Sequence, residues 1–213
     1  MARRSERKAD LISAAQRAMA AHGSAVRLNQ IAEAAGVSSS AILYHYPNID
    51  ELLVEANRAG MERFYNQRVD EISTIEDPAE RLIRTIELGV PQDPDDEEVR
   101  LLCSLGGEAA RNTIYAVLLT SLFDRQVGMY ESILELGVRQ GAFHLTQDAN
   151  VIARNLVALE DAYGYRIMAK HPAIDYRTSV ELILEFARLA TTHPLPTPTT
   201  RERVTPLRGR EIR

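Results

Sequence analysis

Side chains that can hydrogen-bond to bases or phosphates are concentrated in one short segment near the start of the chain. Ser38, Ser39 and Ser40 carry hydroxyl groups, and Tyr44 and His45 follow within about two helical turns. Hydroxyl and imidazole groups can bind phosphate oxygens or base edges, and a tyrosine ring can also pack on a thymine methyl group. The segment therefore has the chemistry for contact with nucleic acid, provided that neighbouring elements position it.

The residues around this segment predict a helix-turn-helix. Apolar residues recur at helical spacing over residues 28–35, which predicts a helix with one apolar face. Gly36 follows, where a helix commonly ends in the left-handed conformation that glycine adopts easily. Ser38 or Ser39 can cap the next helix by accepting a hydrogen bond from a backbone N–H. The side chains of this second helix expected to face inward include Ile42, Leu43 and Tyr46.

The flanking segments complete a three-helix unit. Residues 4–22 form an amphipathic pattern that stops at Gly23, and residues 50–53 open another helix. Residues 4 to about 56 resemble the DNA-binding domain of the TetR family of bacterial transcriptional regulators. The resemblance rests on Ile31-Ala32, Ala35-Gly36-Val37-Ser38, Tyr44-His45-Tyr46-Pro47 and Asp50-Glu51-Leu52-Leu53.

Some positions depart from the family pattern. Leu43 and Ile49 stand where the family usually has a Tyr and a Lys that touch DNA phosphates, and Ser40 stands where Gly is frequent. We expect Tyr44 and Arg27 to replace the two missing phosphate contacts, so that DNA binding is altered and not lost. The residues expected to contact DNA are Arg4, Arg27, Ser38, Ser39, Ser40, Tyr44 and His45.

The distribution of charge fits a DNA-binding head on an acidic body. The whole chain of 213 residues has a net charge of −5. Residues 1–48 nevertheless carry +3 and residues 193–213 also carry +3, which leaves −11 for the residues between them. Because attraction to phosphate depends on local charge, the basic head can face DNA while the body faces away.

Composition argues against several other classes of protein. Cys103 is the only cysteine, so neither an internal disulfide nor a cysteine cluster for a metal can form, and a buried structural role is expected for it. No long apolar run or signal sequence is found, so we expect a cytoplasmic protein without membrane contact. The five histidines are scattered and no catalytic motif is present, which predicts no enzyme activity, cofactor or metal. The alternative function is a helical protein-interaction adaptor that does not bind DNA.

The pattern beyond the head predicts an all-α fold with three parts. Residues 1–48 are the helix-turn-helix DNA-binding domain, residues 49–192 a helical regulatory and dimerisation domain, and residues 193–213 a disordered tail. Helices are expected over about residues 50–73, 114–140, 148–170 and 175–192. Between the first two of these, one helix is expected to begin at residue 78 and a separate short helix to end at about residue 111. The long helix from Asp50 to Ser73 links the head to the body.

The last helix indicates a homodimer. Val180, Ile183, Leu184 and Ala187 form one apolar side, and a second apolar side needs another surface, most simply a copy of itself. Two helices from each subunit would form a four-helix bundle, an arrangement that the TetR resemblance also implies. Two-fold symmetry then predicts a near-palindromic operator in double-stranded DNA. The second apolar side comprises Leu182, Phe186 and Leu189, and the preceding helix offers Ile152, Leu156, Leu159, Tyr163 and Ile167.

The TetR resemblance implies a pocket for a small-molecule effector in each subunit. Aromatic walls with a few polar anchors are the usual form of such a site. The effector would favour a form whose heads are spaced wrongly for DNA, with the helix from Asp50 to Ser73 as the lever. The resemblance alone favours a repressor. The residues expected to bind the effector are Phe64, Glu108, Tyr115, Phe123, Tyr130, Glu160 and Tyr163.

Overall fold

In the described part of the protein, all regular secondary structure is helical and no strand is present. The computed structural model describes residues 2–197, apart from the side chains of residues 2–5, 24, 97, 98 and 104. A short 3-10 helix, Gly23–Ala25, joins the first two α-helices. The α-helices are α1 (Ala2–His22), α2 (Leu28–Ala35), α3 (Ser39–His45), α4 (Ile49–Ser73), α5 (Pro78–Gly89), α6 (Glu97–Ala109), α7 (Thr113–Arg139), α8 (Ala149–Met168) and α9 (Tyr176–Thr191).

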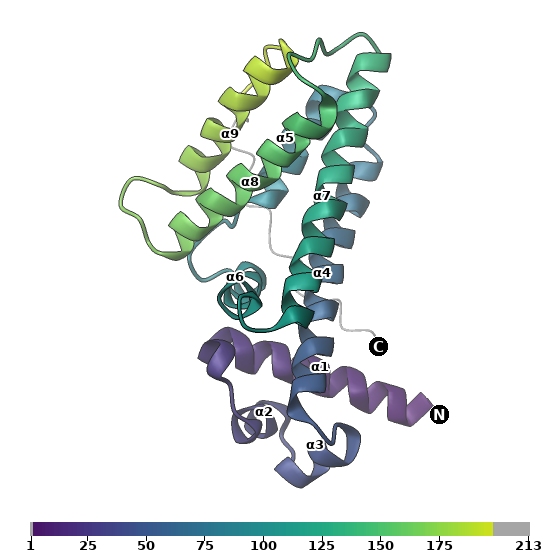
Figure 1. Cartoon of the computed structure of the whole chain (residues 1–213), viewed down its shortest axis with the longest axis vertical. Coiled ribbons are helices and arrows are strands. Elements are labelled where there is room, and N and C mark those ends of the chain that lie inside the picture. Colours follow the sequence, from purple (N-terminus) through teal and green to yellow (C-terminus); the bar gives the residue numbers. More distant parts are fainter. Residues whose placement is uncertain (1, 198–213) are drawn as a thin grey trace.

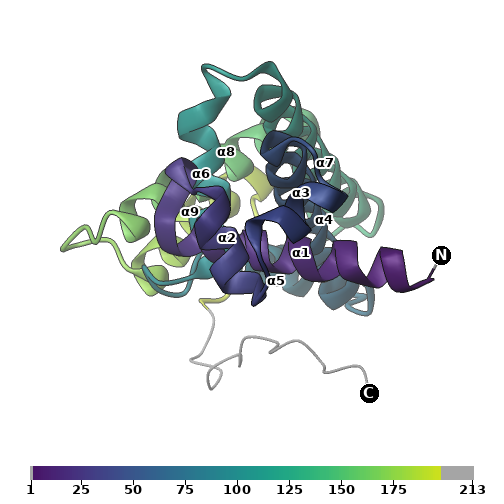
Figure 2. The same cartoon turned by 90° about the horizontal axis from the view of Figure 1, so that it is seen from below.

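Helices α1 to α3 form a small head at one end of the molecule (Figure 1), and α3 lies on its outer side when the head is seen from below (Figure 2). Gly36 ends α2 with φ of 64°, in the left-handed region that glycine adopts easily. Ser38 then caps α3, because its hydroxyl accepts a hydrogen bond from the Ala41 N–H at 3.2 Å. The predicted helix-turn-helix is therefore present, with its turn chemistry as expected.

The core of the head includes residues from two helices of the body, α4 and α6. Leu11 of α1, Ile31 of α2, Ile42 of α3 and Leu52 of α4 are buried together. Leu101 of α6 belongs to the same cluster and is only 3 % exposed. Helix α6 therefore packs directly on the head, beside α1 and α4, so the head is not joined to the body through α4 alone.

The body is built around the long helices α4 and α7, which run side by side away from the head (Figure 1). Helices α5, α8 and α9 pack beside them around a large apolar core. Asp77 and Asp175 cap α5 and α9 through side-chain hydrogen bonds to the backbone N–H groups of Ala79 and Thr178, both at 2.8 Å. These helix starts agree with the sequence-based expectation.

The beginning of the segment expected to be a disordered tail packs on α9. Leu195 is 2 % exposed, and its carbonyl oxygen accepts a hydrogen bond from Arg188 Nε at 2.7 Å. Arg188 Nη2 also donates to the Thr197 hydroxyl at 3.1 Å, so residues 193–197 are held against the helix by apolar and polar contacts together. The rest of the predicted tail, residues 198–213, lies outside the described residues.

The described helices also bear on membrane and metal binding. Within residues 2–197 none of the helices combines the length and apolar character needed to cross a membrane. In the same part of the chain, no group of three His, Cys, Asp or Glu side chains is arranged to hold a metal ion.

Candidate nucleic-acid interface and effector cavity

Helix α3 has one buried face and one exposed face. Ile42 and Tyr46 are 0 % and 1 % exposed, and they fix the helix to the core of the head. Tyr44 is 76 % exposed and forms an edge-to-face contact with the His45 ring, whose centroid lies 5.2 Å away. The expectation that Leu43 faces inward is wrong, because its side chain points from the outer side of this short helix and is 41 % exposed.

Tyr46 ties the end of α3 to two neighbouring helices. Its hydroxyl donates a hydrogen bond to Glu55 Oε2 of α4 at 2.6 Å. The Lys8 ammonium group of α1 lies 4.5 Å from the centroid of the Tyr46 ring. Burial, followed by the hydrogen bond to Glu55, raises the pKa of the Tyr46 hydroxyl, so the phenol keeps its proton. Tyr46 therefore anchors the end of α3, and this anchor helps to keep Tyr44 on the outer side of the helix.

The residues expected to contact DNA lie on the exposed side of the head where their side chains are described. Arg27 immediately precedes α2 and is exposed. The Ser38 and Ser40 hydroxyls lie 2.9 Å apart at the start of α3, where Ser39 is half-buried. His45 is also half-buried, and its Nδ1 has no hydrogen-bond partner among the described residues. The side chain of Arg4 lies outside the described part.

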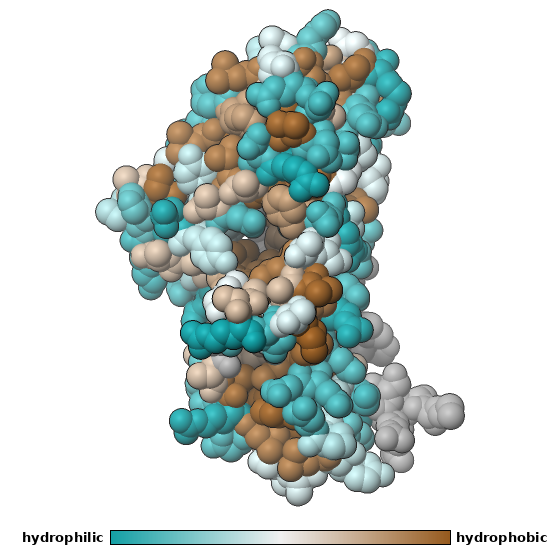
Figure 3. Space-filling model, viewed as in Figure 1, coloured by the Kyte–Doolittle hydropathy of each residue, from teal (hydrophilic) through white to brown (hydrophobic). Residues whose placement is uncertain are grey.

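A cavity of about 360 Å³ opens between the body helices. Figure 3 shows a hollow on the face where α6 and α8 approach each other. Most of its lining is apolar, as is usual for a small-molecule site. The walls are formed by Phe64, Gly89, Pro91, Val99, Leu102, Cys103, Leu119, Thr120, Leu122, Phe123, Gln126, Glu160, Asp161, Gly164 and Tyr165.

The structure brings only some of the expected effector-binding residues to this cavity. Phe64, Phe123 and Glu160 line it. Tyr130 does not line it, but its hydroxyl donates a hydrogen bond to Glu160. The other three expected residues, Glu108, Tyr115 and Tyr163, are not part of the walls.

Packing explains why these three lie elsewhere. Tyr115 is 8 % exposed and packs in an apolar cluster with Met61 and Leu105, near the start of α7. Tyr163 packs against the main core of the body. Glu108 lies in the last turn of α6, beyond the part of that helix that reaches the cavity.

Sequence reasoning did not select Cys103, Gln126, Asp161 or Tyr165 for this site, although all four line it. Helical spacing offers a signal for two of them, because residues four apart lie on one helix face and Tyr165 follows Asp161 by four positions. No local pattern connects Cys103 of α6 with Gln126 of α7, since only the packing of the two helices brings them together.

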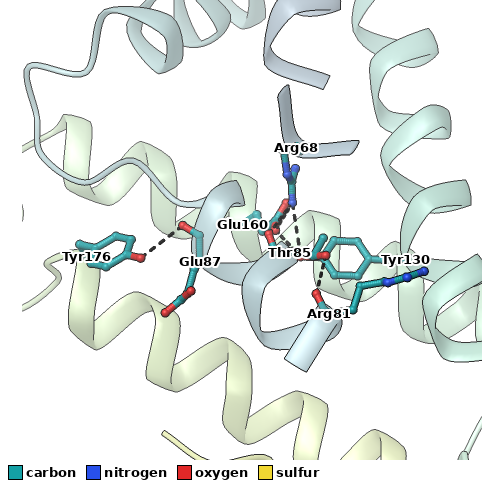
Figure 4. Close-up of polar contacts among 7 residues, drawn as sticks. All are labelled: Arg68, Arg81, Thr85, Glu87, Tyr130, Glu160 and Tyr176. Carbon is teal, nitrogen blue, oxygen red and sulfur yellow. Dashed lines mark hydrogen bonds and ion pairs between the residues drawn. The ribbon is translucent and has the colours of Figure 1, made fainter. Parts of the chain in front are cut away.

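A buried polar network includes Glu160, which also lines the cavity (Figure 4). The Arg68 guanidinium of α4 donates to Glu160 Oε1 of α8 at 2.8 Å and to the Thr85 carbonyl oxygen of α5 at 2.8 Å. Tyr130 of α7 donates to the same Oε1 atom. Gly89 makes room for this carboxylate, because a Cβ atom at that position would overlap with it. The network therefore joins four body helices, α4, α5, α7 and α8, through Arg68 and Glu160.

Burial alters the acidity of two other groups in the cavity wall. Partial desolvation against the cavity wall raises the pKa of the Asp161 carboxyl to about 6, although the residue is exposed at the mouth of the cavity and the Arg68 charge acts in the opposite direction. Burial, with a smaller contribution from Asp161, raises the pKa of the Cys103 thiol to about 11. The thiol is half-buried and lines the cavity, so the expectation of a buried structural cysteine is wrong.

The faces of α8 and α9 divide between the core and the surface. On α9, Ile183 and Leu184 are fully buried in the body, whereas Leu182 and Leu189 are 40 % and 73 % exposed. The α8 stripe proposed for dimerisation is largely wrong, because its members at positions 152, 156 and 167 are at most 3 % exposed within one chain. The exposed residues of α8 include Val151, Ala158 and Ala162 instead.

Comparisons with known proteins agree with this architecture. Residues 11–56 match the family model described as bacterial regulatory proteins, tetR family. A Saccharomonospora viridis protein described as a transcriptional regulator, solved in complex with choline, is 28 % identical with a TM-score of 0.78, over 86 % of this chain and 96 % of that one. A TetR transcription regulator from Haloarcula marismortui is 22 % identical with a TM-score of 0.78, over 88 % and 99 %. The fatty acid degradation regulator FadR from Bacillus halodurans is 19 % identical with a TM-score of 0.65, over 84 % and 95 %. A search of curated protein sequences finds no match.

Proposed function

We propose that this chain is a member of the tetR family of bacterial regulatory proteins, whose model matches residues 11–56, and that it is a repressor that a small molecule releases from DNA. It binds a near-palindromic operator as a homodimer. The observation that carries the proposal is the division of α3 into a buried face, anchored by Ile42 and Tyr46, and an exposed face that presents Tyr44. A helix held in this way can enter the major groove without losing its packing.

The proposed DNA contacts combine phosphate binding and base reading. Arg27, at the start of α2, and Arg4, near the start of the chain, supply positive charge for phosphates. Ser39, Ser40 and Tyr44 lie on or beside the outer surface of α3, from which they can reach base edges or phosphates. Ser38 and His45 complete the proposed set.

The proposed dimer forms through α8 and α9. Helices α8 and α9 pack on each other, and the exposed residues include Leu182 and Leu189 of α9 and Ala158 and Ala162 of α8. Figure 1 shows these two helices next to each other on one side of the body. Burying such a surface against a copy of itself would form a four-helix bundle and fix the distance between the two heads.

The proposed effector site is the cavity, and both α4 and α6 connect it to the head. Phe64 of α4 lines the cavity, while the first turns of the same helix, around Leu52, lie in the head core. Leu102 of α6 lines the cavity, and the adjacent Leu101 packs in the head core. An effector that favours another position of α6 would therefore shift the head and lower operator affinity. The choline complex of the similar S. viridis protein supports a small-molecule effector.

Selection of duplexes from a random pool tests this proposal. The expected result is a set of near-palindromes whose half-sites are one helical turn, about 34 Å, or somewhat more apart. Retention of all sequences equally, or of none, would contradict the proposed operator. An adaptor that binds only proteins would retain none.

A further inference from the structure

The ionisable side chains that line the cavity are the most informative feature that the proposed function leaves unexplained. Glu160 and Asp161 contribute carboxylates, and Cys103 and Tyr165 contribute groups that are neutral near pH 7. The described lining contains no Arg, Lys or His side chain. The cavity wall is therefore acidic, although Arg68 behind it balances one of the two carboxylates.

Glu160 presents two oxygens with different surroundings. Oε1 accepts hydrogen bonds from both Arg68 and Tyr130. Oε2 is buried and has no partner among the described residues, although the whole residue is only 2 % exposed. A buried acceptor without a partner is costly, so a ligand that donates to Oε2 gains free energy by satisfying it.

Asp161 supplies the negative charge that Arg68 does not neutralise. Its carboxylate forms no hydrogen bond or ion pair with the described side chains, and it lines the cavity next to Glu160. Aromatic rings of Phe64, Phe123 and Tyr165 form other parts of the wall. Aromatic faces attract cations and also pack against alkyl groups.

We propose that the effector is a small organic ammonium ion, an inference that rests on the proposed function of the cavity. Its charged nitrogen lies beside the Asp161 carboxylate and Glu160 Oε2, and its alkyl part packs against the aromatic walls. A protonated amine can in addition donate an N–H to Oε2, whereas a quaternary ammonium ion, which has no N–H, is held by charge and by the aromatic walls alone. An anionic effector is excluded, because its charge would meet an unpaired carboxylate.

Cys103 provides a direct assay, because it is the only cysteine of the chain and lines the cavity. Its alkylation by N-ethylmaleimide can be followed by the mass of the full-length protein, without DNA. Three probes separate charge from shape: choline, its neutral isostere with carbon in place of nitrogen, and butylammonium. We expect choline, butylammonium or both to slow alkylation at least about threefold, whereas the isostere has no effect at equal concentration.

A matched pair of variants tests whether the Asp161 carboxylate is the negative charge that binds the cation. Asp161→Asn should weaken binding of the protective cation at least about tenfold, because it removes the unpaired carboxylate. Asp124→Asn is the control, since this exposed residue of α7 does not line the cavity. Circular dichroism of both variants confirms folding before binding is compared.

The outcomes distinguish this inference from the proposed function. Equal protection by the neutral isostere, no protection by either cation, or unchanged affinity in Asp161→Asn would overturn the ammonium effector. Release of selected duplexes by a neutral or anionic compound, without cation binding, would overturn it and leave the repressor proposal intact. Cation binding that leaves duplex affinity unchanged would support the ligand class and contradict the repressor mechanism.

Discussion

Arg68 on α4 and Glu160 on α8 form an ion pair of 2.8 Å in which each side chain is only 2 % exposed. The two residues are 92 positions apart in the sequence, so the pair exists only when the body is folded. The same carboxylate contributes to the wall of the cavity. This pair therefore links the stability of the body to the site where an effector would bind.

Removing one partner of this pair should be strongly destabilising. Arg68→Met leaves the Glu160 carboxylate buried without its counter-charge, and we expect it to lower the free energy of unfolding by about 3–5 kcal/mol. The double variant Arg68→Met/Glu160→Gln should lose less than the sum of the two single variants, because it leaves no buried charge. Urea unfolding of the four proteins measures the coupling, and additive losses would show that the pair does not act as a unit.

The exposed tyrosine of α3 should contribute to operator affinity. Tyr44→Ala removes a side chain that is 76 % exposed, so the head should keep its stability while the affinity for a selected duplex falls about tenfold. Val138→Ala is a suitable control, since this side chain is exposed on α7, far from the head. Electrophoretic mobility shift gives the affinity, and an unchanged value would remove Tyr44 from the proposed contacts.

The outer face of α9 should be required for dimerisation. Leu189→Glu places a charge on a leucine that is 73 % exposed in one chain, and we expect it to produce monomers. Val117→Glu introduces the same charge at a 62 % exposed position of α7, away from this face, and should remain dimeric. Sedimentation at micromolar concentration distinguishes the two. A dimeric Leu189→Glu protein would place the interface elsewhere.

The fold was largely predictable because its signals are local. Gly36, Ser38, Asp77 and Asp175 mark helix ends through their own conformational or hydrogen-bonding preferences, and the structure uses them as expected. The helix-turn-helix was predictable for the same reason. All the residues that define the motif lie within one continuous segment of the chain, residues 28–46.

The faces of the body helices were harder to assign. The periodicity of α8 shows which residues share a stripe, but it does not show whether that stripe contacts the same chain or another one. Ile152 and Leu156 therefore looked available to a partner, although α8 buries them in its own body. The cavity raises the same difficulty, because Cys103, Gln126 and Asp161 come from three helices whose relative positions are set by packing.

The acidity of Asp161 predicts a pH-dependent effect on stability. Its pKa in the folded protein is about 6, above the ordinary value of 3.8, so folding favours the protonated form. The contribution of this group to stability therefore decreases as the pH rises from about 4 to about 6. Asp161→Asn should gain stability relative to the unmodified protein over this interval. Thermal unfolding at pH 4 and pH 8 measures the change, with Asp124→Asn as control.

The same ionisation should govern cation binding. Asp161 is surrounded by Arg68 of α4, Cys103 of α6, and Glu160 and Tyr165 of α8. Choline has a fixed charge, so any change in its affinity near pH 6 must come from the protein. If choline is the protective cation, its affinity should rise as the pH increases through about 6 and Asp161 ionises. Calorimetric titration at pH 5 and pH 8 measures this, and equal affinities would exclude Asp161 as the counter-charge.

The central claim is that two copies of this chain together hold a basic head against duplex DNA. Fluorescence anisotropy of a labelled, selected duplex, titrated with protein at several salt concentrations, tests it most directly. We predict saturation at two chains per duplex, with an affinity that falls steeply as salt increases. A protein that sediments as a monomer and leaves the anisotropy unchanged, even at low ionic strength, would contradict the account.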